Sequence, residues 1–363
     1  MITSEVHVRT DILAFSDAAL QQEMEKLGWQ RFRSDQLISW LWEHGVRSFE
    51  EMTNLSKQQR QELNERYYIP RLVTDKVQYS TDGTVKFRFK LHDGYMIESV
   101  LIPVDEEERY TVCVSSQAGC SLTCKFCATG QMGLLRNLTA SEIFDQYTEV
   151  NRCCQERYGR KLSNIVFMGM GEPLLNYKQV VGAIRRLSSA KGPGLSPRRM
   201  TVSTAGIAKM IVRLADEDLK VNLALSLHAA DDDKRSTMMP INEYNDLQSL
   251  MSALKYFNQK TGNKISYEYI AFAGFNDQAS DARNLVRLCS HFPVMVNVIE
   301  YNPVRGSDYE KSSEDQINQF AKMVREQGVM ITVRRSRGKD IDAACGQLAN
   351  QEQNPISKTI PTS

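Results

Sequence analysis

Apolar side chains recur at helical spacing between residues 16 and 68. One such stripe contains Leu37, Ile38 and Leu41. The pattern favours a small helical domain, which we assign to residues 1–70. Because aromatic side chains are buried more often than they are exposed, we expect those of this domain to lie in its core rather than on a stacking surface. These side chains are Trp29, Phe32, Trp40 and Trp42.

Two runs that follow have the pattern of β-strands. They cover residues 85–91 and 95–104, and the His-Asp-Gly sequence between them is typical of a hairpin turn. We therefore expect residues 71–109 to form a β linker.

From about residue 110, short β-rich runs alternate with amphipathic helical windows. Capping boxes at Thr139–Glu142 and at Ser312–Asp315 each predict the start of a helix. This order predicts an α/β domain over residues 110–348, with a parallel sheet that is doubly wound or curled into a full or partial barrel. In each case the chemistry belongs at the carboxyl ends of the strands. The predicted strands cover residues 111–116, 164–169, 199–204, 221–228, 265–272, 294–301 and 329–335.

Composition narrows the classes of protein further. The 363 residues carry 45 basic and 44 acidic side chains, so a charged partner must be met by local patches. A hydrophobic content of 42% excludes a chain that is disordered as a whole. We expect no signal peptide, no membrane span and a cytoplasmic location, because no apolar run approaches the roughly 18 residues a span requires. Residues 349–363 have little to bury, which predicts a disordered tail.

Three of the eight cysteines stand close together, directly after the first strand of the repeating unit. Cys120, Cys124 and Cys127 have the spacing of ligands to one soft metal centre, either zinc or an iron–sulfur cluster. A structural zinc site requires four ligands, and no second close pair of Cys or His residues follows. The spacing therefore favours a four-iron cluster with one open iron. The alternative is a zinc-stabilised RNA-binding module without catalysis.

The cysteine motif, with Phe126 before its last thiol, resembles the signature of the radical S-adenosylmethionine (SAM) superfamily. Further segments resemble the RlmN family of dual-specificity methyltransferases, which act on carbon 2 of adenine in 23S ribosomal RNA and transfer RNA. This resemblance spans about residues 10–350 and implies a partial (β/α)6 parallel barrel. The matching segments are VCVSSQAGCSLTCKFCATG (112–130), MGMGEPLL (168–175), SLHA (226–229) and RGKDIDAACGQL (337–348).

The resemblance implies two cofactors, a single [4Fe-4S] cluster and SAM, which binds the open iron. Cys120, Cys124 and Cys127 are the implied cluster ligands. Most of the implied SAM contacts follow predicted strands, so their side chains are expected to converge on one mouth. The implied SAM contacts are Gly171, Glu172, Ser203, Ser226, Leu227, His228 and Asn302.

Two further cysteines receive roles only from the resemblance, since alone each would be expected to be a packing thiol. Cys345 is the implied methyl carrier, and Cys113 is the implied resolving thiol that forms a transient disulfide with it. A radical step suits carbon 2 of adenine, which offers no lone pair or acidic proton. Glu98 is the implied proton acceptor or adenine-contacting carboxylate. Matching no motif, Cys153, Cys154 and Cys289 are expected to be packing thiols.

Two basic stretches are candidate RNA contacts, although solvated surface is the simpler interpretation of each alone. Residues 181–200 contain five Lys and Arg side chains and no acid, and residues 333–339 contain four more. The implied targets are adenosine 2503 of 23S rRNA and adenosine 37 of some tRNAs, with residues 1–70 contacting RNA and a partner such as flavodoxin supplying electrons. The nearest alternative activity is methylation of carbon 8 of the same adenosine by the related resistance enzymes.

Overall fold

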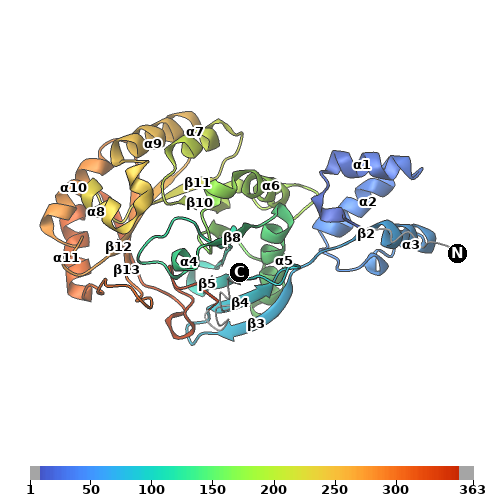
Figure 1. Ribbon diagram of the computed structural model, residues 1–363, viewed down its shortest axis with the longest axis horizontal. Coiled ribbons are helices and arrows are strands. Elements are labelled where there is room, and N and C mark those ends of the chain that lie inside the picture. Colours follow the sequence, from blue (N-terminus) through green and yellow to red (C-terminus); the bar gives the residue numbers. More distant parts are fainter. Residues whose placement is uncertain (1–8, 351–363) are drawn as a thin grey trace, which may run out of the picture.

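The computed structural model describes residues 9–350, which form a helical N-terminal domain and a larger α/β domain (Figure 1). Within the N-terminal domain a short parallel pair, β1 and β2, joins the two ends of the domain. Ser16 caps the first helix, and Ser56 forms a capping box with Gln59 at the third. The elements are β1 (Thr10–Asp11), α1 (Asp17–Lys26), α2 (Arg31–Trp42), α3 (Lys57–Arg66) and β2 (Tyr67–Tyr68).

The aromatic residues of this domain divide between core and surface. Trp29 and Trp42 are buried, as predicted, and Trp40 is half-buried. The prediction was wrong for Phe32, which is 49% exposed. Phe32 lies off the helical stripe that begins at Leu37, and its ring is covered by the guanidinium of the neighbouring residue instead.

One sheet runs through the whole α/β domain in the order β14-β13-β12-β11-β10-β9-β6-β5-β4-β3. Neighbouring strands from β6 to β14 pair in parallel, whereas β3 to β6 pair antiparallel. The predicted α/β class with a partial parallel barrel is confirmed. The strands are β3 (Val73–Tyr79), β4 (Val85–Lys90), β5 (Met96–Val104), β6 (Arg109–Cys113), β9 (Asn164–Phe167), β10 (Met200–Thr204), β11 (Asn222–Ser226), β12 (Ile265–Ala271), β13 (Met295–Glu300) and β14 (Met330–Arg334).

The strands of the predicted linker continue the same sheet as the barrel. The hairpin β4–β5 is confirmed, and β5 pairs with β6 so that Val100 lies opposite Cys113. No run predicted β3, because this edge strand is partly exposed on both faces and lacks a regular alternation. A separate antiparallel pair, β7 (Gln117–Gly119) and β8 (Leu134–Asn137), flanks the cysteine loop.

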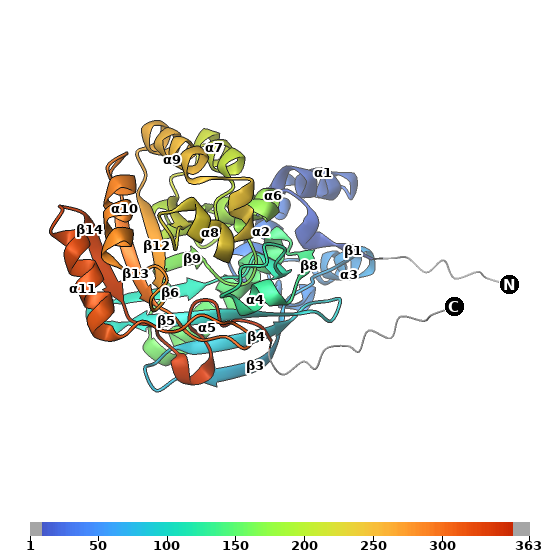
Figure 2. The ribbon, with the colours of Figure 1, turned by 60° about the vertical axis from the view of Figure 1, so that its left-hand side comes forward.

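Helices between the parallel strands follow one another along the curved sheet (Figure 2). The capping box at Thr139 is confirmed at the start of α5. The second prediction was wrong by one residue: Ser313 caps α11, and Ser312 is buried, with its hydroxyl donating to Asp277 Oδ2 at 2.8 Å. The helices are α4 (Ala128–Gln131), α5 (Ala140–Tyr158), α6 (Tyr177–Ser188), α7 (Ala208–Asp216), α8 (Asp232–Met238), α9 (Leu247–Thr261), α10 (Ala279–Cys289) and α11 (Glu314–Arg325).

Single 3-10 turns complete the described chain. Cys153, Cys154 and Cys289 pack against the hydrophobic core, as predicted. Within residues 9–350, no helix combines the length and apolar character needed to cross a bilayer. The 3-10 turns are Ile12–Ala14, Phe49–Glu51, Asp105–Glu107, Pro173–Asn176, Pro197–Arg199, Pro240–Glu243 and Lys339–Ile341.

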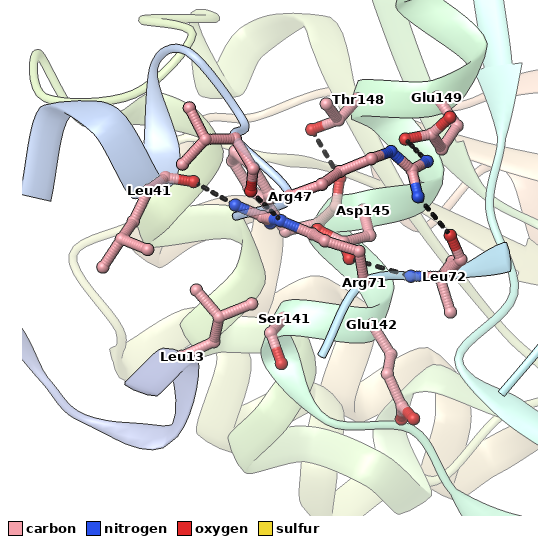
Figure 3. A network of polar contacts seen from close by, with 12 residues as sticks. Leu13, Leu41, Arg47, Arg71, Leu72, Ser141, Glu142, Asp145, Thr148 and Glu149 are labelled. Atoms are coloured by element: carbon pink, nitrogen blue, oxygen red, sulfur yellow. Dashed lines mark hydrogen bonds and ion pairs between the residues drawn. The ribbon is translucent and has the colours of Figure 1, made fainter. Parts of the chain in front are cut away.

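A buried ion pair joins the two domains (Figure 3). Arg71, just after the helical domain, pairs with Asp145 on α5 and also donates to the backbone oxygens of Leu41 and Val46. The Asp145 carboxylate accepts a second hydrogen bond, from the backbone N–H of Leu72 at 3.3 Å. One arginine therefore holds the end of α2 against α5.

The predicted disordered tail lies mostly outside the described residues. Ala349 and Asn350, its first two residues, are held instead: the backbone N–H groups of both donate to the carboxylate of Glu98, and Asn350 is buried. The other residues of that prediction, 351–363, lie outside the part of the chain that the structure describes.

Candidate active site

The carboxyl ends of the parallel strands open on one cavity, which contains about 1180 Å³ of space when its open mouth is included. The cysteine loop closes one side of it, and residues 343–348 close another. A cavity of this size accommodates a cofactor-sized ligand. The candidate residues that line it are Cys113, Cys120, Cys124, Cys127, Gly171, Glu172, Ser203, Ser226, His228 and Cys345.

The cysteine loop makes a tight turn between its first two thiols. Thr123 has a φ of 49°, a left-handed conformation that a β-branched residue adopts only where its surroundings enforce it. The backbone N–H of Cys127 donates to the oxygen of Cys124 at 3.1 Å, which turns the last thiol back toward the others. Burial raises the pKa of Cys120 to about 11 and that of Cys124 further still. Thiols in such a place ionise when a metal centre binds them.

Glu172 directs a buried carboxylate toward the cavity. Backbone N–H groups of Leu174 and Ala205 donate to its two oxygens at 3.0 and 2.7 Å. Desolvation raises its pKa to about 7, so the site favours a ligand that brings positive charge or donors. The preceding Gly171 has a φ of 95°, and a Cβ there would lie 2.4 Å from that of Gln117. Glycine is therefore required at this turn.

His228 follows β11 in a left-handed conformation with a φ of 56°. Its Nδ1 accepts a hydrogen bond from the backbone N–H of Ile270 at 3.1 Å, and its carbonyl accepts one from Asn276 Nδ2 at 2.6 Å. Burial lowers the pKa of His228 to about 3. The imidazole is therefore neutral, with its proton on Nε2. The ring of Phe126, from the cysteine loop, meets it edge-on at 4.8 Å.

Arg235 is a site-building residue that sequence reasoning missed. It is fully buried, and its guanidinium donates to the backbone oxygens of Ala205, Ser226 and Leu227 and to the side chain of Asn242. These bonds hold the ends of β10 and β11 together beneath the cavity. Its surroundings in sequence, DDDKR, suggest a solvated helix. One signal in the sequence could have indicated its burial. Met238 and Met239 follow it by three and four residues, so at helical spacing all three lie on one face, which is buried.

Cys113 and Cys345 line the same cavity although they lie far apart in the sequence. Cys113 ends β6, and desolvation raises the pKa of its thiol to about 12. Cys345 is exposed at the cavity wall, where partial desolvation also raises its pKa. The guanidinium of Arg334 opposes both shifts and forms an ion pair with Glu268 at 3.5 Å. Among the described residues, nothing donates a hydrogen bond to Glu268 Oε2.

Three predicted site residues do not line the cavity. Leu227 is fully buried, and its backbone N–H donates to the backbone oxygen of Glu268 at 3.0 Å. The side chain of Asn302 donates to Ser336 Oγ at 2.8 Å. Glu98 binds the backbone of residues 349 and 350. All three join segments that frame the cavity.

Comparisons with known proteins agree with one another over most of the chain. The family model for the ribosomal RNA large subunit methyltransferase N-terminal domain matches residues 10–69, and that for the radical SAM superfamily matches residues 114–286. A probable dual-specificity RNA methyltransferase RlmN of Cytophaga hutchinsonii is 52% identical over 325 residues, covering 90% of this chain and 88% of the relative. The dual-specificity RNA methyltransferase RlmN 2 of Myxococcus xanthus is 44% identical over 346 residues, covering 94% and 91%. The chain belongs to the RlmN family.

A solved structure agrees with this membership. The crystal structure of a radical SAM methyltransferase from Sphaerobacter thermophilus superposes with a TM-score of 0.89 at 39% identity, over 93% of this chain and 99% of that one. An RlmN protein is a radical SAM RNA methyltransferase, which implies one [4Fe-4S] cluster and SAM as cofactors. The family thus favours the cluster over zinc at the three thiols.

The residues present fit these cofactors. In residues 9–350, no three His, Cys, Asp or Glu side chains meet in a group that could hold a metal ion. A four-iron cluster makes no such demand, because each of its thiolates binds a different iron. Three thiols that line one open cavity suit that geometry. Among the described residues, Glu268 Oε2 has the 3.5 Å ion pair with Arg334 but accepts no hydrogen bond, so this oxygen in the cavity suits a ligand with hydrogen-bond donors.

Part of the first basic stretch of this RlmN chain is an internal contact rather than open surface. Arg186 pairs with Asp17 at 2.6 Å and lies over the ring of Trp42, and Lys191 pairs with Asp35. These partners all belong to the helical domain. The stretch therefore helps to attach that domain to α6.

Proposed function

We propose that this protein methylates carbon 2 of adenosine 2503 in 23S rRNA and of adenosine 37 in some tRNAs, in the cytoplasm. The names of its RlmN relatives, which are dual-specificity RNA methyltransferases, support RNA as the substrate. A small reducing protein such as flavodoxin would supply the electrons. RNA would reach the cavity through its open mouth, with the target base turned out of its stack.

In this proposal Cys120, Cys124 and Cys127 hold the cluster, and SAM lies against the ends of β9 to β13. The two cofactors together supply a carbon-centred radical that can abstract hydrogen. The Glu172 carboxylate receives the ammonium group of SAM, and the neutral His228 keeps a second charge away from it. Gly171, Ser203 and Ser226 complete the SAM site, whereas Leu227 and Asn302 would support it from behind the cavity lining, through their bonds to Glu268 and Ser336.

Two thiols would take part in the methyl transfer, Cys345 as the carrier and Cys113 as the resolving thiol. Cys345 would accept a methyl group from one SAM and lose a hydrogen atom from it to the radical that the cofactors supply, and the resulting methylene carbon would bond to carbon 2 of the adenine. The adduct would then lose the carbon 2 proton to a base and one electron to the oxidised cluster. The Cys113 thiolate would then attack the sulfur of Cys345 and break its bond to the methylene carbon. That carbon takes up a proton to give the methylated base, and a disulfide remains. An external dithiol reopens this disulfide before the next turnover. Glu98, for which the resemblance implies a proton acceptor or an adenine contact, instead accepts hydrogen bonds from the backbone of residues 349 and 350 and does not line the cavity.

A single observation carries this proposal: Cys113, Cys345 and the three motif cysteines line one cavity although they lie up to 232 residues apart. Packing thiols have no reason to share a ligand-sized cavity with a metal motif. The proposal is tested with anaerobically reconstituted protein, SAM labelled in its methyl group, a reductant and 23S rRNA or tRNA. Wild type should place label on carbon 2 of adenosine, detected by mass spectrometry with chromatographic standards for the C2 and C8 products.

Two variants separate the roles of the thiols. Cys345→Ala should keep its iron and lose at least about a thousandfold in methylation, since the carrier atom is gone. Cys120→Ala should lose iron and activity together. Label on carbon 8, or normal methylation by Cys345→Ala, would contradict the proposal.

A further inference from the structure

The C-terminal residues 338–350, here called the carrier segment, run across β4 and β5 toward the cysteine loop (Figure 2). Among residues 9–350, no hydrogen bond joins the Cys345 side chain to another residue, so the position of this thiol depends on what holds its neighbours in the segment. Three separate groups of hydrogen bonds do so.

The first anchor lies at the start of the segment, in the β3–β4 turn. Gly338 N–H donates to Asp82 Oδ2 at 2.9 Å, and Asp340 accepts from Ser80 Oγ at 2.6 Å and from Thr81 N–H at 3.1 Å. Gly338 has a φ of 65°, and a Cβ there would lie 2.9 Å from a methyl carbon of Thr84. The segment therefore starts in close contact with the turn.

The second anchor joins the segment to α4, which directly follows the last motif cysteine. Ala128 N–H donates to the oxygen of Gly346 at 2.8 Å, and Thr129 Oγ1 donates to that of Leu348 at 2.5 Å. Both bonds lie within three residues of Cys345. They fix its distance from the cysteine loop.

The third anchor is the buried carboxylate of Glu98, on β5. Its Oε2 accepts from Ala349 N–H at 3.0 Å and from Asn350 N–H at 3.4 Å. Its Oε1 lies 3.7 Å from Nζ of Lys86, which in turn donates to the oxygen of Asp342 at 3.3 Å. Glu98 and Lys86 are only 4% and 7% exposed. The pair thus grips the segment on both sides of Cys345.

We propose that Glu98 is a positioning residue, which holds Cys345 at Cys113 by binding the backbone of the carrier segment, rather than the group that accepts a proton from the base. Both oxygens of Glu98 are engaged within the protein, and Glu98 lies outside the cavity lining. β5 also pairs with the strand that carries Cys113, with Val100 opposite this thiol. One strand therefore sets both partners of the thiol pair. The inference rests on the proposed function, because it assumes that the two thiols react with each other.

The test measures how readily the two thiols pair, which requires neither SAM nor RNA. Full-length, cluster-loaded protein is equilibrated anaerobically with mixtures of reduced and oxidised glutathione. Each Cys113–Cys345 disulfide formed consumes one glutathione disulfide and releases two glutathione thiols. Peptide mapping by mass spectrometry then gives its equilibrium constant. Methylation rates and unfolding midpoints are recorded for the same samples.

We expect Glu98→Ala to lower the equilibrium constant about tenfold, a shift of about 30 mV toward easier reduction. Glu98→Gln, which keeps an acceptor for the backbone, should recover most of the constant and of the methylation rate. Asn350→Ala should shift the constant in the same direction, because it removes the 2.7 Å hydrogen bond from the Asn350 side chain to the Met96 backbone oxygen. An asparagine side chain does not act as a proton acceptor in catalysis, so this variant tests positioning alone. The matched control is Ser99→Ala, the next residue on β5, whose hydroxyl donates to Gln146 and not to the carrier segment.

Three results would overturn the inference: a constant that Glu98→Ala leaves unchanged, a Gln variant as inactive as the Ala variant, or an equal shift in the Ser99→Ala control. A wild-type protein that forms the disulfide but methylates no RNA would refute the proposed function alone and leave the positioning role standing.

Discussion

The junction in Figure 3 allows a direct test of what holds the helical domain in place. The side chains of Arg71 and Asp145 are 4% and 2% exposed. Asp145→Asn keeps the shape and one acceptor for Leu72 N–H but removes the charge, so the Arg71 guanidinium is left buried without its counter-ion. Breaking one side of such a pair costs about 3–5 kcal/mol. Because the Leu72 bond can persist, we expect the lower end, about 3 kcal/mol.

The assay combines urea unfolding with hydrogen exchange of α1 to α3, which should exchange faster when the junction loosens. Arg47→Ala is the matched control, since the pair Arg47–Glu149 spans the same junction but the arginine side chain is 41% exposed. Solvent screens that pair, and its loss should cost less than about 1 kcal/mol. Equal losses in the two variants, or unchanged exchange of the helical domain in Asp145→Asn, would refute the reasoning.

Further predictions concern the cavity walls. Arg235→Met should lose at least about 3 kcal/mol of unfolding free energy in urea and bind SAM about tenfold more weakly by calorimetry, because several buried carbonyls lose their donor. Arg235→Lys should not restore either property, since one ammonium group cannot reach all of these carbonyls. The folded pKa of His228 is about 3, against 6.5 for the free side chain, so between these pH values the unfolded chain binds more protons than the folded one. The free energy of unfolding should therefore fall on acidification below about pH 6.5, by up to about 1.4 kcal/mol per pH unit. Urea titrations at several pH values should show that His228→Gln lacks this contribution. Gly171→Ala should cost about 3 kcal/mol in urea unfolding, since its Cβ would meet Gln117, whereas Gly274→Ala, with a φ of 69° and open space around it, should cost about 1 kcal/mol; similar losses would contradict the steric argument.

The parts of the fold that sequence predicted are those with a local cause. The parallel strands from β6 to β13 are largely buried, and so each reads as an apolar run. The predicted carboxyl ends of the parallel strands lie within two residues of the observed ones, except at β6, which ends three residues earlier than predicted. That the cysteine motif and the segments after the strands converge can then be predicted without knowing any side-chain contact, because parallel strands bring their carboxyl ends to one edge of the sheet. Ser312 shows the limit of such reasoning. It matches the capping pattern, but the neighbouring Ser313 caps the helix, and only tertiary burial of Ser312 decides between them.

The parts that sequence missed depend on contacts between distant residues. Glu98 meets Ala349 across 251 positions, and nothing near either residue signals the bond. Arg235 lies among charged neighbours, and its burial follows from the carbonyls that β10 and β11 present to it. Both are charged residues in the interior, which local patterns assign to the surface because most charged side chains lie there.

The antiparallel strands β3 to β5 connect the two thiols of the proposed pair, which lie 232 residues apart in the chain. Cys113 lies on β6, the strand where the antiparallel part of the sheet meets the parallel part. Cys345 lies on a segment fastened to the turn before β4, to Lys86 on β4 and to Glu98 on β5. The proposed thiol pair therefore belongs to the antiparallel side of the sheet, whereas the proposed SAM contacts follow β9 to β13. The cavity between them would bring carrier and cofactor together, so that substitutions in the β3–β5 extension should change transfer through Cys345 while leaving SAM binding intact.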